Sequence, residues 1–201
     1  VFIGVLVDDD TKGISIGKEE DKMGIRASAT AEIIFEDCFV PDSARVGKEG
    51  RGFMIAMQTL QMSRPVVAAI SVGIAQAAIE AAVAYSHHRK QFGVKIATFE
   101  MVQQMIADMV MKTEAARILT YKACVAQMNK DKKAGLYSAM SKCFASDTAM
   151  EVTTTAVQVM GGNGYSRENP VEKYMRDAKI MQIYEGTNQV QRLVIANETT
   201  F

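Results

Sequence analysis

The sequence predicts a mainly α-helical protein: an antiparallel helical bundle preceded by a fragment of an antiparallel β-domain. Residues 1–46 combine short β-branched runs with turn residues, which is the pattern of antiparallel strands. After the glycine-rich segment 47–52 the chain is rich in Ala and Met with helical spacing, and the joints between these segments are short. Short joints favour antiparallel neighbours, so we expect residues 47–201 to form the bundle and residues 1–46 to be a piece of an antiparallel sheet or barrel.

The β part is expected to contain short strands, which end at Pro41-Asp42-Ser43. We predict them at residues 1–7, 14–16, 30–35 and 38–40. The run 1–7 is apolar and has no Met or polar leader before it. Because apolar edge strands are rarely left uncovered and unprotected in native proteins, we expect the chain to be a fragment, or the ordered part, of a longer protein.

The helical part is expected to hold long helices joined by turns. The first runs over residues 53–88, with a kink or a break at Pro65, which lacks a backbone donor. We predict a second helix from Thr98, as a capping residue, to about Asn129, and a third from about Lys133 to Met160 with a stop at Gly161-Gly162. A fourth, shorter helix should run from Pro170 to before Tyr184. The last helix should follow Gly186, with Thr187 or Asn188 as its cap.

Composition excludes several classes of function. The chain has 201 residues with 23 basic and 23 acidic side chains, so it lacks the basic excess of a nucleic-acid binder. No run approaches the roughly 18 uninterrupted apolar residues of a membrane span. Three cysteines without a CxxC spacing, and the adjacent pair His87 and His88, disfavour a disulfide framework and a metal site. A reducing compartment and no metal are expected.

Three segments contain residues suited to chemistry, although each also has a simple structural explanation. Tyr184-Glu185-Gly186-Thr187 sets a carboxylate on a joint between helices, although a solvated Glu is the commoner case. The segment 161–164, Gly-Gly-Asn-Gly, is a helix stop or a place where backbone approaches a ligand. The segment 89–93 either complements a helix dipole or supplies charge, amide and ring to a dinucleotide.

Taken in order, these and other segments closely resemble the acyl-CoA dehydrogenase flavoenzymes, over nearly the whole chain. The matching segments are Met23-Gly24-Ile25-Arg26, Phe35-Glu36-Asp37-Cys38-Phe39-Val40-Pro41, Gly47-x-x-Gly50-x-Gly52-Phe53, Ser63-Arg64-Pro65, Arg89-Lys90-Gln91-Phe92-Gly93, the run 158–165, the run 170–179 and Ile183-Tyr184-Glu185-Gly186-Thr187. The resemblance is to the second half of the family. It implies that residues 1–46 are the C-terminal part of the middle β-domain and residues 47–201 the C-terminal helical bundle domain. Ser63-Arg64-Pro65 is most similar to the medium-chain members.

The resemblance implies FAD-dependent α,β-dehydrogenation of a straight-chain acyl-CoA to the trans-2-enoyl-CoA, a step of fatty acid β-oxidation. Glu185 matches the base that removes the α-proton while a hydride leaves the β-carbon for flavin N5. Some relatives carry their base at the position of Ser63, which cannot serve, so Glu185 is the expected base. Arg64, Tyr184 and Gly186 match the substrate site, and the backbone N–H of Glu185 matches a donor to the thioester carbonyl.

The resemblance also implies cofactor residues and partners. Residues matching contacts to the neighbouring subunit's FAD are Arg89, Phe92, Gln158 and Gly162; those matching contacts to the same subunit's FAD are Thr187 and Gln189. The family is usually a homotetramer, a dimer of dimers, reoxidised by electron-transfer flavoprotein, and a mitochondrial matrix or a bacterial cytoplasm fits equally well. Two alternatives stay open: an inactive, truncated helical oligomerisation module, and an acyl-CoA oxidase that uses O₂.

Overall fold

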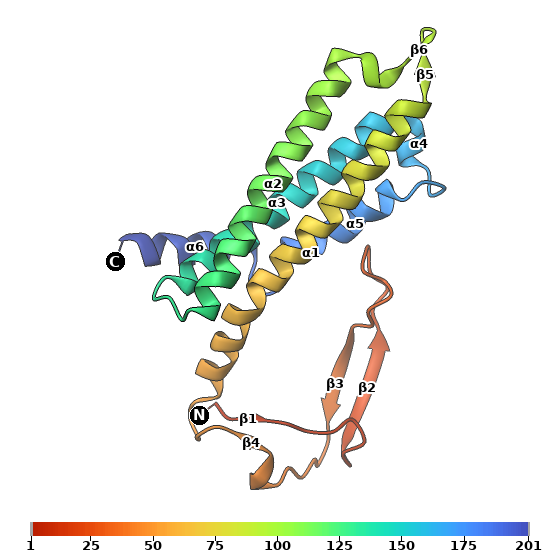
Figure 1. Cartoon of the computed structure of the whole chain (residues 1–201). Coiled ribbons are helices and arrows are strands. Elements are labelled where there is room, and N and C mark those ends of the chain that lie inside the picture. Colours follow the sequence, from red (N-terminus) through yellow and green to blue (C-terminus); the bar gives the residue numbers. More distant parts are fainter. Residues whose placement is uncertain (1, 201) are drawn as a thin grey trace. The chain divides into compact units, whose positions relative to one another are not determined.

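The computed structural model describes residues 2–200 and divides the chain into two compact units, Val1–Gln61 and Met62–Phe201. Figure 1 follows the chain through its helices and strands. The division falls within α1 (Gly52–His88), the first long helix. The boundary expected after residue 46 stays a prediction. Val1 and Phe201, which belong to the expected domains, lie outside the described residues.

The first unit contains short antiparallel strand pairs. Strand β2 (Ile14–Glu19) pairs with β3 (Ala31–Phe35), and the register shifts between Ile16 and Glu19. Strand β1 (Gly4–Val5) pairs with β4 (Arg45–Val46), which follows the short helix η1 (Asp42–Ala44). The mainly helical fold class with its antiparallel β fragment is therefore confirmed.

The strand expected at residues 38–40 is wrong, because this segment is irregular. Asp37 adopts a left-handed conformation with φ 47°, which turns the chain out of the extended direction just before the segment. Pro41 follows and cannot donate to a strand ladder. The apolar run 1–7 is also shorter as a strand than expected, since only Gly4–Val5 of its described residues pair.

Helix α1 continues through Pro65 for 37 residues, so the chain does not break at this proline, and the alternative of a kink there stays a prediction. Proline removes a single donor from the ladder, and Pro65 is buried, so packing on this residue offsets the lost hydrogen bond. By length and composition α1 is also the one helix within residues 2–200 that could cross a membrane, with 44% of its most apolar window buried. We interpret it as a core helix because Val67, Val72 and Ile79 pack inside the protein.

The second unit continues with a hairpin and further helices. After β5 (Lys90–Gln91), β6 (Val94–Lys95) and η2 (Ile96–Thr98) come α2 (Glu100–Met128), α3 (Ala134–Met160), α4 (Gly162–Tyr165), α5 (Val171–Met181) and α6 (Asn188–Thr200). Thr98 does not cap α2, because its hydroxyl donates back to the Lys95 carbonyl. Thr187 does cap α6: its Oγ1 accepts a hydrogen bond from the Val190 N–H at 3.3 Å.

The core of this unit lies between α1, α2, α3 and α5, the long helices that run alongside one another in Figure 1. Many of the buried residues are alanines, which let helix backbones approach closely. They include Ala75, Ala78, Ala82, Ala149, Ala156 and Ala178, with Met109 and Met160 filling the spaces between them. This rigid bundle supports the joint between α5 and α6, where Glu185 lies.

Candidate active site

Glu185 lies on the joint between α5 and α6 in a strained backbone conformation. Its φ is 54°, in the left-handed region that non-glycine residues seldom enter, and Gly186 follows with φ 92°. The Asn188 N–H closes the joint by donating to the Gln182 carbonyl at 3.0 Å. Strain of this kind persists where the surrounding structure enforces it, and it concentrates at functional sites.

Two residues of α1 approach the Glu185 side chain from 122 and 121 positions earlier in the sequence. The Ser63 hydroxyl donates a hydrogen bond to Glu185 Oε2 at 2.6 Å. The Arg64 guanidinium interacts electrostatically with the Glu185 carboxylate. Burial lowers the pKa of Arg64, and the negative charge of Glu185 raises it by a smaller amount. Arg64 Nε is buried and has no acceptor among the described residues, so this donor is open to a ligand. The result is a half-buried carboxylate beside a hydroxyl and a cation.

Tyr184 is half-buried beside Glu185, but its hydroxyl points back to α5. It donates to Met181 Sδ at 2.9 Å. Burial raises the pKa of Tyr184, and the adjacent Glu185 charge acts in the same direction. The phenol is therefore neutral at ordinary pH, and Tyr184 shapes the wall of the site rather than exchanging protons there.

Two buried side chains form hydrogen bonds with the backbone carbonyls of residues 185 and 186. Lys142 Nζ donates to the Gly186 carbonyl at 2.8 Å and to Asn188 Oδ1 at 2.9 Å. Gln191 Nε2 donates to the carbonyls of Glu185 and Gly186, at 3.2 and 3.0 Å. Neither residue was predicted from the sequence. A single Lys within the otherwise uncharged stretch 134–146 was the signal that could have indicated Lys142.

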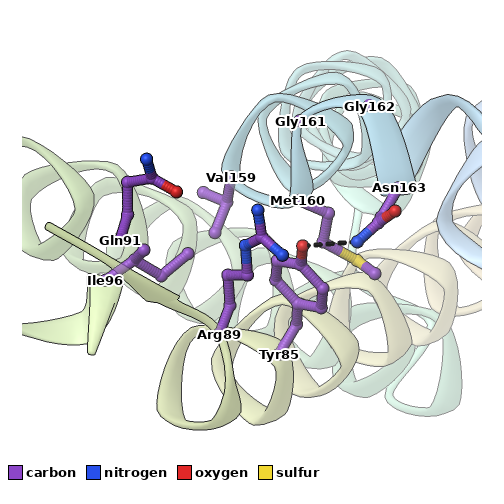
Figure 2. A pocket seen from close by; sticks show the side chains of 9 residues that line it. All are labelled: Tyr85, Arg89, Gln91, Ile96, Val159, Met160, Gly161, Gly162 and Asn163. Atoms are coloured by element: carbon purple, nitrogen blue, oxygen red, sulfur yellow. Dashed lines mark hydrogen bonds between the residues drawn. The ribbon is translucent and has the colours of Figure 1, made fainter. Parts of the chain in front are cut away.

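A second group of expected residues lies at the end of α1 and α3, around a cavity of about 340 Å³ (Figure 2). Arg89 points into it beside Tyr85, whose hydroxyl accepts a hydrogen bond from Asn163 Nδ2 at 2.7 Å. Gly161 and Gly162 form the facing wall, and a Cβ at either position would meet no atom within 4 Å. Backbone is therefore open to a ligand here.

Phe92 and Gln158 do not line this cavity. Phe92 lies at the turn of the β5–β6 hairpin with φ 52°, and its side chain is 86% exposed. Its ring packs edge-on against that of Phe99, with 6.4 Å between the ring centroids. Gln158 lies exposed in the last turn of α3, where its carbonyl accepts the Gly161 N–H. Both are exposed, and each is next in sequence to a residue that lines the cavity, Gln91 and Val159.

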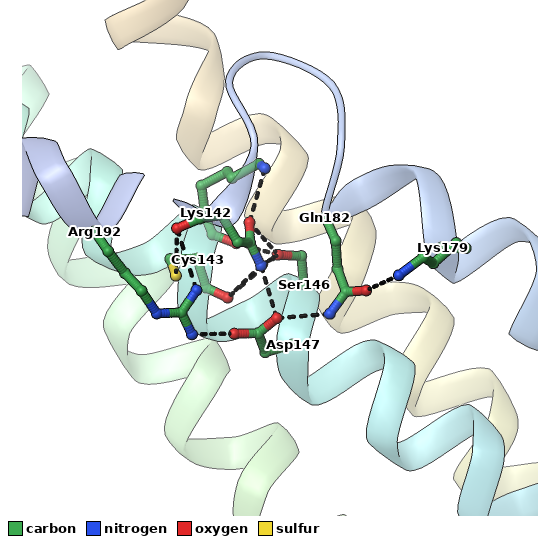
Figure 3. Close-up of polar contacts among 8 residues, drawn as sticks. Lys142, Cys143, Ser146, Asp147, Lys179, Gln182 and Arg192 are labelled. Carbon is green, nitrogen blue, oxygen red and sulfur yellow. Dashed lines mark hydrogen bonds and ion pairs between the residues drawn. The ribbon is translucent and has the colours of Figure 1, made fainter. Parts of the chain in front are cut away.

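Thr187 and Gln189 line a different hollow of about 500 Å³, near the start of α6. Its floor is a polar network around Asp147 (Figure 3). Burial alone raises the pKa of Asp147, but hydrogen bonds from Arg192, Gln182 and Asn188 outweigh this and lower it below the usual value. The expected cofactor residues thus form two separate groups.

No group of three or more His, Cys, Asp or Glu side chains within residues 2–200 is arranged to hold a metal ion. The site has instead one carboxylate on a strained joint, a hydroxyl donor to it, and cations set at its edge and at a separate cavity. Residues 50–200, which carry all of these groups, match the family profile "Acyl-CoA dehydrogenase, C-terminal domain". The chain belongs to the acyl-CoA dehydrogenase family.

Similar proteins agree with this assignment. A probable acyl-CoA dehydrogenase of Mycobacterium tuberculosis is 52% identical over 95% of the chain and 49% of its own length. The mitochondrial short-chain specific acyl-CoA dehydrogenase of Mus musculus is 48% identical over 95% of the chain and 46% of its own. The butyryl-CoA dehydrogenase of Megasphaera elsdenii superimposes with a TM-score of 0.97 at 48% identity, over 99% of this chain and 52% of that one. This acyl-CoA dehydrogenase chain spans about half the length of these relatives.

Proposed function

We propose that the full-length protein containing this chain is an FAD-dependent acyl-CoA dehydrogenase that converts a straight-chain acyl-CoA to the trans-2-enoyl-CoA, with Glu185 as the base. The observation that carries the proposal is the Glu185 carboxylate, held on a left-handed joint by a 2.6 Å hydrogen bond from Ser63. Relatives named for butyryl-CoA and short-chain substrates support a straight acyl chain.

The chain's own groups suit removal of the α-proton. Ser63 binds Oε2, and Oε1 accepts no hydrogen bond from residues 2–200, so it is open to take the proton. The Glu185 N–H likewise has no acceptor within that range, and it suits the thioester carbonyl, on which negative charge develops. Loss of the α-proton to Glu185 and of hydride from the β-carbon leaves the new Cα=Cβ bond. Ser63, a neutral hydroxyl, donates to the base and does not replace it.

The acyl-CoA dehydrogenases are flavoproteins, and FAD when bound would supply the acceptor for the hydride. The chain's donor set fits such an anionic dinucleotide. Arg89 offers a charge at a cavity whose facing backbone, at Gly162, is uncovered. The exposed ring of Phe92 and the exposed amide of Gln158 lie nearby. On the separate hollow, the Thr187 hydroxyl and Gln189 amide would hold the FAD of their own subunit.

We infer a homotetramer, since α2 leaves an apolar face uncovered. Its members recur at helical spacing and are all exposed: Met111, Ile118, Tyr121, Val125 and Met128. Electron-transfer flavoprotein is the proposed acceptor. A chain in the structure described as the electron transferring flavoprotein of Acidaminococcus fermentans is 52% identical, with a TM-score of 0.96. Mitochondrial and bacterial relatives support a matrix or cytoplasmic location.

Glu185→Gln in the full-length protein tests the proposal. We expect enoyl-CoA formation from butyryl-CoA to fall by roughly 10²–10⁴-fold, the usual contribution of a general base. The matched control is Glu198→Gln, the same change at an exposed position of α6, which should retain the wild-type rate. A near wild-type rate for the Glu185 variant would rule out Glu185 as the base.

The two alternatives give different results with the unmodified full-length protein. A helical oligomerisation module would be purified without stoichiometric flavin and would form no enoyl-CoA. An oxidase would be reoxidised by air as fast as by electron-transfer flavoprotein after anaerobic reduction with acyl-CoA. We expect bound FAD, and reoxidation that is slow in air and fast with electron-transfer flavoprotein.

A further inference from the structure

Lys142 is a lysine whose side chain is wholly inside the helical unit. It is 0% exposed, on a face of α3 made otherwise of small or apolar residues such as Ala139, Cys143 and Ala145. Burying an ammonium group is costly unless it is hydrogen-bonded, so its bonds indicate what it does. Burial lowers the pKa of Lys142 to about 8, while the charges of Cys143, Asp147 and Glu185 raise it and that of Arg64 lowers it.

Lys142 donates hydrogen bonds to the joint that carries Glu185 and to the first residue of α6. Nζ donates to the Gly186 carbonyl at 2.8 Å and to Asn188 Oδ1 at 2.9 Å. Asn188 is in turn fixed by α3: its Nδ2 donates to Ser146 Oγ at 2.9 Å and to Asp147 Oδ1 at 2.7 Å (Figure 3). Within this network, Lys142 is the α3 residue that also bonds the backbone carbonyl of Gly186, the residue after Glu185.

The hydrogen bonds to the Gly186 carbonyl stabilise the backbone conformation of Glu185 and Gly186. Glu185 and Gly186 are both left-handed, at φ 54° and 92°, and an isolated Glu does not prefer this state. Lys142 and Gln191 both bind the Gly186 carbonyl and keep it turned inward. Without the Lys142 bond, the turn formed by residues 185 and 186 loses its hydrogen bond to α3, because within residues 2–200 no other side chain of that helix bonds the Gly186 backbone.

We propose that Lys142 is a positioning residue for Glu185: by binding the Gly186 carbonyl from α3, it holds the left-handed turn that keeps the carboxylate at Ser63 and the Glu185 N–H open. This inference rests on the proposed role of Glu185 as the base. Lys142 acts through the backbone and touches no reacting atom. Its loss should therefore slow proton removal while leaving the cavity at Arg89 unchanged, since no residue of that cavity bonds to Lys142.

Proton removal can be measured apart from hydride transfer with methylthioacetyl-CoA, whose third chain atom is sulfur and carries no hydrogen. The full-length, FAD-loaded protein is incubated with it in D₂O, and mass spectrometry follows deuterium entering the carbon next to the carbonyl. We expect Lys142→Met to slow this exchange about 10²-fold, the loss typical of a misplacement of about 1 Å. FAD content and KM for butyryl-CoA should change little, whereas kcat should fall with the exchange rate.

Ser146→Ala is the matched control, because the Ser146 hydroxyl bonds the Asn188 side chain and the Lys142 carbonyl but forms no hydrogen bond with residues 185 or 186. It should exchange at the wild-type rate, which separates positioning of the turn from general damage to the network. Should the Met variant not fold, Lys142→Gln keeps a polar head one atom short of Nζ and should slow exchange at least threefold. A folded Met or Gln variant with wild-type exchange would overturn the proposal.

The same assay distinguishes failure of this inference from failure of the proposed function. If Glu185→Gln abolishes exchange and Lys142→Met leaves it unchanged, Glu185 is the base and Lys142 does not position it. If Glu185→Gln itself leaves exchange unchanged, the base lies elsewhere and the proposed function fails first. Exchange lost in both variants, and retained in Ser146→Ala, supports both statements together.

Discussion

Replacing Gly186 by Ala should destabilise the helical unit by an amount that follows from its geometry. Gly186 has φ 92°, and a left-handed conformation costs an L-residue roughly 1–2 kcal/mol. A Cβ there would lie 2.6 Å from Gln191 Nε2, and Gln191 is fully buried. Displacing this amide weakens its bonds to the carbonyls of Glu185 and Gly186, each worth about 0.5–1.5 kcal/mol. The expected loss is roughly 2–5 kcal/mol of unfolding free energy.

Thermal unfolding followed by circular dichroism measures this change. A loss of this size lowers Tm by at least about 4 °C in a chain of this length. Gly73→Ala is the matched control, because Gly73 lies exposed within α1 and a Cβ there meets no atom within 4 Å. Alanine in a helix interior is favoured over glycine by roughly 0.5–1 kcal/mol, so this variant should keep or raise Tm. An unchanged Tm for Gly186→Ala would refute the account of a tightly held turn.

Three further predictions concern charge, cofactor and assembly. Burial lowers the pKa of Lys142 from 10.5 to about 8. At a pH between these two values, Lys142 is therefore protonated in the unfolded chain and deprotonated in the folded chain. The stability of wild type relative to Lys142→Met should therefore rise with pH across that window, and urea titrations below and above pH 8 would contradict this if the difference were flat. Gly162→Ala should leave Tm unchanged, since no atom lies within 4 Å of its Cβ position, but should lower the FAD affinity of the full-length protein in equilibrium dialysis. Ile118→Glu should shift the tetramer to smaller species in sedimentation velocity, and an unchanged tetramer would exclude this face of α2 as a contact.

The helices followed from the sequence because their signals are local. Apolar spacing, the Gly161 stop and the Thr187 cap each act within a turn or two of their own position. The errors had two kinds of cause: a distant contact that overrode a local preference, and a local conformation that the residue pattern did not reveal. Pro65 does not break α1 because it is buried, whereas residues 38–40 form no strand because the left-handed Asp37 precedes them and Pro41 follows.

The candidate site shows the same division. The order of its motifs was enough to indicate a family and to single out Glu185, Arg64 and Arg89. The partners of Glu185 were not predictable, since Ser63 meets it across 122 positions and Lys142 reaches its turn across 44. Sequence spacing contains no information about such pairs unless helix packing is already known.

The amino-acid sequence alone determined the kinds of elements, their order and the residue types available for chemistry, because these depend on neighbours a few positions apart. Only the tertiary structure decided that a glutamate on a short joint adopts a left-handed conformation, that a serine from another helix binds it, and that a buried lysine supports the turn. These features depend on how the helices pack, and packing joins residues that the chain keeps far apart.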